Sequence, residues 1–289
     1  IPAEQLDEVV GKKYTSAQAF QNDIPNFLTT LGWSKEKAQF FGDRIRIEAA
    51  RGSGHAWGAE MRNGDVALLR ARIKKTGMDY KGFNIACHEF GHTVEQTITL
   101  NDVDYYMMHG VPNTAFTEAL AFVFQKRDLY LLGMKESSSN KEQLMALSNL
   151  WDCYEIMGVS LVDINLWKWL YNNPNADAAQ VKEAVITISK DVWNKYYADV
   201  FGTKDETILA IYSHMIDNPL YLSAYPIGHL IDFQLEKQFV GKKFSDEVQR
   251  IFEQGRLIPQ VWMKGGTGEP LSNKPILEAS AKAIEELSK

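Results

Sequence analysis

Apolar residues recur every three or four positions along most of this chain, and this spacing limits the possible folds more than any other feature. Such residues share one face of an α-helix, so each stripe predicts a helix that packs its apolar face on another element. Ser16 stands just before the first stripe and suits a helix N-cap. The three clearest stripes are Phe20, Ile24, Phe27, Leu28 and Leu31; Leu144, Leu147, Trp151, Tyr154 and Met157; and Val181, Val185, Ile188, Val192 and Tyr196. We therefore expect a mainly α-helical fold.

One region departs from the helical spacing. Residues 45–49 alternate between apolar and polar side chains, which is typical of a half-buried strand. Two further segments, Ala56–Met61 and Val66–Ile73, flank Asn63 and Gly64, a pair favoured in tight hairpin turns. We expect a small antiparallel sheet here, near the N-terminus.

Composition excludes several classes of protein. The chain has 289 residues, and its 37 acidic residues outnumber its 31 basic residues, which gives a net charge of -6. This charge argues against nucleic acid or an anionic membrane as the main partner. No run approaches the ~18 apolar residues of a membrane span, so a soluble chain is expected. The sequence shows no signal-peptide pattern and indicates neither the compartment nor the oligomeric state.

Residues 88–92 read His-Glu-Phe-Gly-His and carry the clearest chemical signal. The two histidines are four positions apart, so they lie on one face of a helix about one turn apart. This spacing lets two imidazoles bind one zinc ion. At about 100° per residue, Glu89 lies about 60° beyond His92, where its carboxylate reaches a water on the metal. The opposite face of the helix is apolar and consists of Phe83, Cys87, Phe90, Val94 and Ile98.

A zinc ion at a catalytic site usually takes three protein ligands, so two histidines leave one ligand missing. Glu118 is the candidate, because it stands in a helical stretch that is apolar nearly all round. An unpaired buried carboxylate is very costly, and a metal ion would offset that cost. The alternative is a Glu118 that pairs with a helix end or with Arg127. Glu95, three residues after His92, is a candidate for fixing one of the imidazoles from behind.

The combination of residues 88–92 with Glu118, 26 positions after His92, resembles the gluzincin metallopeptidases of the thimet oligopeptidase and oligopeptidase F family, and their relative angiotensin-converting enzyme. The likeness extends over about residues 50–240. It implies a zincin-like catalytic domain over residues 1–289, and a Zn²⁺ ion held by His88, His92 and Glu118. It also implies hydrolysis of peptide bonds in oligopeptide substrates, with Glu89 as the general base.

Two more stretches resemble this family. Residues 54–58, which include Ala56 and Trp57, resemble the edge strand whose backbone pairs with an extended peptide. His214 and residues 221–235 resemble the segment that carries the family's transition-state histidine and tyrosine. The resemblance therefore implies that His214 and Tyr225 donate hydrogen bonds to the oxyanion. Tyr221, one helical turn before Tyr225, would line the same site.

Several alternatives stay open at this point. Family members are usually about twice as long as this chain, so it is either a compact peptidase or the catalytic half of a longer protein. A zinc-stabilised module that binds peptides without cleaving them is a further alternative, although it would not need Glu89. His214 is otherwise an exposed histidine on a helix over residues 205–216. A di-iron bundle is disfavoured, because its Glu-x-x-His pattern occurs once, at Glu89 and His92.

Overall fold

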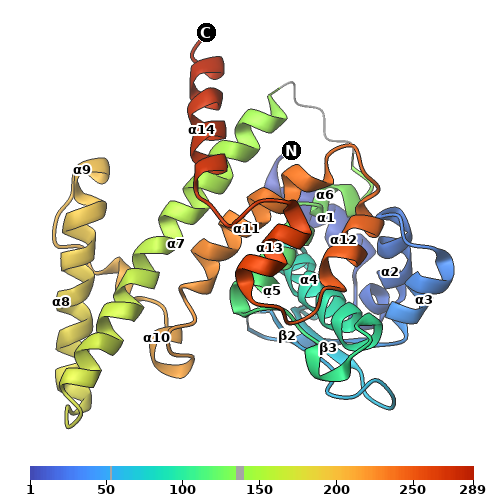
Figure 1. Cartoon of the computed structure of the whole chain (residues 1–289), viewed down its shortest axis with the longest axis horizontal. Coiled ribbons are helices and arrows are strands. Elements are labelled where there is room, and N and C mark those ends of the chain that lie inside the picture. Colours follow the sequence, from blue (N-terminus) through green and yellow to red (C-terminus); the bar gives the residue numbers. More distant parts are fainter. Residues whose placement is uncertain (53, 135–139) are drawn as a thin grey trace. The chain divides into compact units, whose positions relative to one another are not determined.

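The computed structural model describes residues 1–52, 54–134 and 140–289 (Figure 1). The chain divides into two compact units, one within residues 1–139 and 231–272 and the other within residues 140–230 and 273–289. Most of the described residues are helical, and a small sheet lies near the N-terminus, so the expected fold class is confirmed. The single catalytic domain over residues 1–289 stays a prediction. Within the described ranges, each helix is too short or too polar to cross a membrane.

The first unit holds the sheet and most of the large buried aromatic side chains. Its helices are α1 (Ala3–Lys13), α2 (Ala17–Thr30), α3 (Lys35–Gly42), α4 (Tyr80–Asp102), α5 (Thr114–Gln125), α6 (Asp128–Leu131), α12 (Phe244–Phe252) and α13 (Pro259–Thr267), with a 3₁₀ turn, η1 (Tyr106–Met108). The predicted cap of α2 is confirmed, because the Ser16 hydroxyl accepts a hydrogen bond from the backbone N–H of Ala19.

The sheet contains β1 (Ile45–Ala50), β2 (His55–Trp57) and β3 (Ala67–Arg72), in the order β1-β3-β2. The β2 and β3 strands pair antiparallel, as expected, but β1 pairs with β3 in parallel, so the sheet is mixed. The expected hairpin is also longer than a tight turn. The Asp65 carboxylate accepts hydrogen bonds from the backbone N–H groups of Glu60 and Val66, which closes a loop there in place of a strand ladder.

Helix α4 occupies the centre of the first unit, packed against β3 and α5. The apolar stripe predicted for it is fully buried, since Phe83, Cys87, Phe90, Val94 and Ile98 are each 0% exposed. The helix begins at the cap residue Asp79, whose carboxylate accepts from the backbone N–H of Gly82 at 2.7 Å. The buried stripe therefore fixes the rotation of α4, and the two histidines face the opposite way.

The second unit contains the long antiparallel helices α7 (Lys141–Asn172) and α8 (Ala178–Tyr196), which lie side by side (Figure 1). Each contains one of the predicted stripes, but the predicted burial of the α7 stripe is wrong, because Leu144, Trp151 and Met157 are exposed. The second unit also holds α9 (Ala198–Phe201), η2 (Ile208–Ala210), α10 (His214–Asp217), α14 (Lys274–Leu287) and the start of α11 (Ala224–Phe239), which ends in the first unit. The prediction of a helix over residues 205–216 is wrong, because this segment holds only the short 3₁₀ turn η2 before α10 begins.

Candidate metal centre

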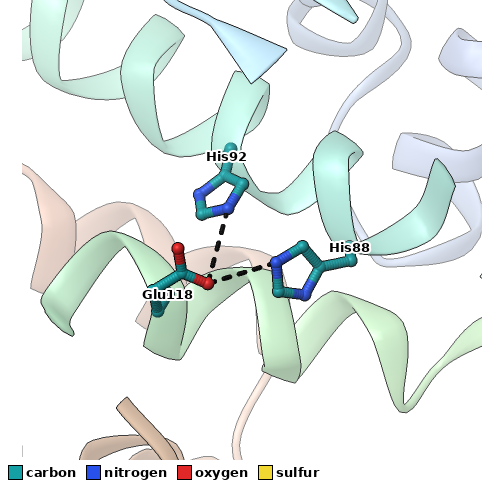
Figure 2. Close-up of side chains that lie close together, drawn as sticks. All are labelled: His88, His92 and Glu118. Carbon is teal, nitrogen blue, oxygen red and sulfur yellow. Dashed lines mark ion pairs between the residues drawn. The ribbon is translucent and has the colours of Figure 1, made fainter. Parts of the chain in front are cut away.

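His88 and His92 on α4 and Glu118 on α5 point toward one another (Figure 2). Oε2 of Glu118 lies 3.2 Å from Nε2 of His88 and 3.7 Å from Nε2 of His92. One ligand atom from each side chain lies within 4.8 Å of the others. Two imidazole nitrogens and a carboxylate oxygen suit a divalent metal such as zinc, so the donor set fits the metal that the motif implies.

Arg127, one of the two alternative partners considered for Glu118, has a different partner. The Arg127 guanidinium binds Glu236 instead, through two hydrogen bonds of 2.6 and 2.9 Å. Glu118 itself is only 2% exposed and faces the two histidines. The buried carboxylate therefore lies where a cation would offset the cost of burial.

The histidines differ in their electrostatic surroundings. Burial lowers the pKa of His92 to about 4, so its ring is neutral at neutral pH. Burial also opposes a charge on His88, but the hydrogen bond to Glu118, the negative charges of Glu118 and Glu89, and the hydrogen bond to Gln125 together outweigh burial and raise the pKa of His88. A metal ion binds only a deprotonated imidazole nitrogen, so a proton and a metal ion would compete for Nε2 of His88.

A side chain of α5 lies within hydrogen-bond distance of the Nδ1 atom of each imidazole. Nδ1 of His88 lies 3.1 Å from the Gln125 carbonyl oxygen, and Nδ1 of His92 lies 2.9 Å from the Thr117 hydroxyl. The Thr117 hydroxyl also hydrogen-bonds Glu95, whose pKa burial raises to about 7. Glu95 therefore acts on His92 only through Thr117. Thr117 and Gln125 were not predicted from the sequence, although Thr117 directly precedes the candidate ligand Glu118.

Glu89 lies beside the start of β2. A Cβ on Gly54 would fall 2.9 Å from Cγ and 3.1 Å from Oε1 of Glu89, and 2.7 Å from Cγ2 of Ile85. Only glycine permits the backbone to pass this close. Burial raises the pKa of Glu89 to about 7. The carboxyl expected to act as the base is thus confined between α4 and the segment that leads into β2.

Two of the three residues predicted to bind the substrate, Ala56 and Trp57, lie on β2. β2 is an edge strand, since β3 lies on one of its sides and no described strand lies on the other. Trp57 is 44% exposed, and the Arg70 guanidinium lies 5.0 Å from its ring centroid. The strand therefore offers backbone groups that another chain could pair with.

A cavity of about 430 Å³ lies further along α4, one turn beyond His92. It is lined by Gly58 after β2, by Glu95 and Gln96 on α4, by Thr117 on α5, and by Arg256, among others. The exposed Arg256 guanidinium rests on Gly110, where an added Cβ would fall 2.9 Å from Nη2. The cavity therefore combines a cationic group with a residue that contacts a candidate ligand.

The remaining predicted site residues cluster in the second unit. The ring centroids of His214 and Tyr225 are 6.3 Å apart, and those of Tyr221 and Tyr225 are 5.6 Å apart. His214 is half-buried at the start of α10, rather than exposed on a longer helix. The three residues are thus neighbours within their unit, and their roles stay predictions.

The sequence matches no family model and no curated protein. The solved structures that resemble the fold include the following three. A protein described as an oligoendopeptidase F from Bacillus anthracis str. Ames has a TM-score of 0.61 at 14% identity, over 94% of this chain and 46% of its own. PZ peptidase A has a TM-score of 0.66 at 16% identity, over 94% and 49%. Metallocarboxypeptidase 1 of Trypanosoma cruzi has a TM-score of 0.54 at 12% identity, over 99% and 70%.

These comparisons show that the chain has a metallopeptidase-like fold. At such low identity they show the fold alone. The chain spans about half the length of the first two of these proteins.

Proposed function

We propose that this chain is a zinc-dependent peptidase of the gluzincin type that cleaves oligopeptides. The observation that carries this proposal is the convergence of His88, His92 and Glu118, with Glu89 on the same helix beside an open strand edge. The metallopeptidase-like fold supports the proposal. A metal site that only stabilised the fold would not need a buried carboxyl such as Glu89 next to its ligands.

His88, His92 and Glu118 would hold the zinc ion. When bound, zinc acts as a Lewis acid that lowers the pKa of a water and polarises the scissile carbonyl. Glu89 would take the proton of the attacking water and later deliver it to the leaving amine. A pKa near neutrality suits both transfers, because the same carboxyl must accept and release the proton. Tyr225 and His214 would donate hydrogen bonds to the oxyanion, as the family resemblance implies.

The substrate would lie extended along β2, so that its main chain continues the sheet past Ala56 and Trp57. Backbone pairing gives binding without strong dependence on peptide sequence. The cavity beside Arg256 would receive a substrate side chain. Selectivity would then come from the charge of this cavity rather than from the strand.

A Glu89→Gln variant tests the proposal directly. Glutamine keeps the shape of the side chain but cannot accept the proton, so turnover should fall by at least about 100-fold while zinc content stays unchanged. The assay compares cleavage of a set of quenched peptides, with zinc measured on the same samples and again after chelation. A wild-type chain that holds zinc but cleaves no peptide would favour the binding module or an incomplete catalytic half. Equal turnover by the two proteins would mean that another group is the base.

A further inference from the structure

A run of hydrogen bonds connects the buried carboxylate of Asp128 with the ring of His88. The Asn84 amide nitrogen donates to Oδ2 of Asp128 at 2.7 Å. The Gln125 amide nitrogen donates to the Asn84 carbonyl oxygen at 2.7 Å. The Gln125 carbonyl oxygen then lies 3.1 Å from Nδ1 of His88. Asp128 is 6% exposed and also accepts from the Tyr80 hydroxyl at 2.6 Å.

These bonds can run in only one direction. A carboxylate has no proton to donate, so Asn84 must turn its NH₂ group toward Asp128. Its carbonyl oxygen then faces Gln125, which must donate in turn. The remaining oxygen of Gln125 faces His88 and can only accept. Nδ1 of His88 must therefore carry a proton, and Nε2, the nitrogen beside Glu118, is the atom left for a metal ion.

A shorter arrangement of the same kind serves His92. The Thr99 hydroxyl donates to Oε1 of Glu95 at 3.1 Å, and the Thr117 hydroxyl also hydrogen-bonds Glu95. A hydroxyl has one proton, so a Thr117 that donates to Glu95 can only accept from Nδ1 of His92. With Glu95 ionised, Nδ1 keeps its proton and Nε2 faces Glu118. Because burial raises the pKa of Glu95 to about 7, this shorter arrangement has no fixed direction near neutral pH.

We propose that Asp128 is a positioning residue which fixes the tautomer and ring orientation of His88 through these one-way hydrogen bonds, so that its Nε2 atom faces the metal. The inference rests on the proposed ligand set. It adds a function for Asn84, Gln125 and Asp128, which lie outside the motif. The side-chain amides of Asn84 and Gln125 can each rotate by half a turn and exchange donor for acceptor. Only the carboxylate of Asp128 therefore fixes the direction of the longer relay.

The isosteric variant Asp128→Asn tests the longer relay. An asparagine at 128 can donate to Asn84, which would let both amides turn over and bring the Gln125 NH₂ group against Nδ1 of His88. The proton would then move to Nε2, and the apparent zinc affinity should fall about 10- to 100-fold, the usual cost of a lost outer contact. Affinity is measured by competition with a chromogenic chelator at fixed pH. Tyr80→Phe is the matched control, because it removes a donor to Asp128 without reversing the relay.

A second substitution separates the relay from a purely structural role of Asp128, which also begins α6. Gln125→Glu places an acceptor beside His88 that needs no direction from Asp128. Adding Asp128→Asn to the Gln125→Glu variant should lower zinc affinity less than about threefold relative to Gln125→Glu alone. The Asn84 amide can then donate to the carboxylate at position 125, which still accepts from His88. A structural defect at α6 would persist in both backgrounds.

Three results would overturn the inference. They are a folded Asp128→Asn protein that binds zinc within twofold of the wild type, an equal loss in the Gln125→Glu background, and an equal loss in Tyr80→Phe. If Asp128→Asn does not fold, Asn84→Leu breaks the same relay at its middle and must lower zinc affinity similarly. None of these measurements uses turnover. A chain that binds zinc as expected but cleaves no peptide would refute the proposed function and leave the relay standing.

Discussion

Gly91 on α4 lies directly against Ala121 on α5, and a Cβ at Gly91 would fall 2.6 Å from the Cα of Ala121 and 2.8 Å from the Leu120 carbonyl oxygen. Both contacts are with backbone atoms, which cannot move aside without shifting the helix. This close approach brings Glu118, one turn earlier on α5, within reach of the histidines on α4. The glycine inside the motif therefore sets the distance between the two helices that supply the ligands.

We expect Gly91→Ala to push α5 away from α4. Forcing an extra methyl group into a packed contact costs about 1–3 kcal/mol of unfolding free energy. Zinc affinity should fall at least tenfold as well, because Glu118 moves with α5. Chemical denaturation and chelator competition measure the two effects. Gly11→Ala on α1 is the control, since its Cβ would meet nothing closer than 3.6 Å. Equal effects of the two substitutions would contradict the role given to Gly91.

We expect Gly54→Ala to impair turnover while the protein keeps its zinc. The added Cβ would overlap Ile85 and displace the side chain of Glu89, the proposed base. None of the three atoms nearest to this Cβ belongs to a proposed metal ligand. A fall of about 10- to 100-fold in kcat is expected, as for a displaced base. Gly52→Ala provides the control, because nothing lies within 4 Å of its Cβ. Normal kcat in Gly54→Ala would show that Glu89 tolerates the displacement or is not the base.

Tyr225→Phe tests the roles carried over from the family resemblance. A donor that acts on the oxyanion strengthens its hydrogen bond in the transition state, so removal of its hydroxyl should lower kcat on the order of 100-fold and barely change KM. Tyr221→Phe is the matched variant, because the two rings are neighbours. A larger loss in Tyr221→Phe would exchange their roles. Undiminished kcat in both variants would remove these tyrosines from the mechanism.

The charge of Arg256 predicts which peptides are preferred. Its guanidinium lines the cavity beside the metal site, so a peptide with an acidic side chain there should bind better than one with a lysine. Arg256→Glu should reverse this preference, and Arg256→Gln should abolish it, with the change mainly in KM. Quenched peptides with blocked termini that differ at one position measure the effect. An unchanged preference would mean that substrates do not enter this cavity.

Asp79 should make the free energy of unfolding depend on pH, and this dependence can be measured without substrate. Burial alone raises its pKa, but hydrogen bonds from Lys74, Gly82 and Arg72 outweigh burial and lower the pKa to about 2. The unfolded chain therefore binds a proton more readily at Asp79 than the folded chain does. Its contribution to stability is present above about pH 4 and is lost as the pH falls toward about 2.

The difference in unfolding free energy between the wild type and Asp79→Asn should accordingly shrink over this pH range. Asparagine still caps a helix, whereas Asp79→Ala should lose about 1 kcal/mol more near neutral pH. Urea denaturation at several pH values measures both differences. A difference that stays constant from pH 6 to pH 2 would refute the ion pairing of Asp79.

The sequence by itself determined the features that depend on near neighbours in the chain. The spacing of apolar residues predicted α2, α7 and α8, and it predicted which face of α4 is buried. The relation between His88 and His92 is equally local, because a helix fixes the geometry of residues four apart. No tertiary contact is needed to place these two rings on one side.

Only the tertiary structure decided how distant segments meet. An alternating strand pattern says nothing about the direction of its partner, so the parallel pairing of β1 with β3 was not predictable. Gln125 reaches His88, and Asp128 reaches Asn84, only because α5 returns along α4 at the contact made by Gly91. Nothing in the sequence marks these polar side chains as part of a metal site. They form a directed series of hydrogen bonds because packing brings the Asp128 carboxylate within hydrogen-bond distance of Asn84, and Asn84 within reach of Gln125.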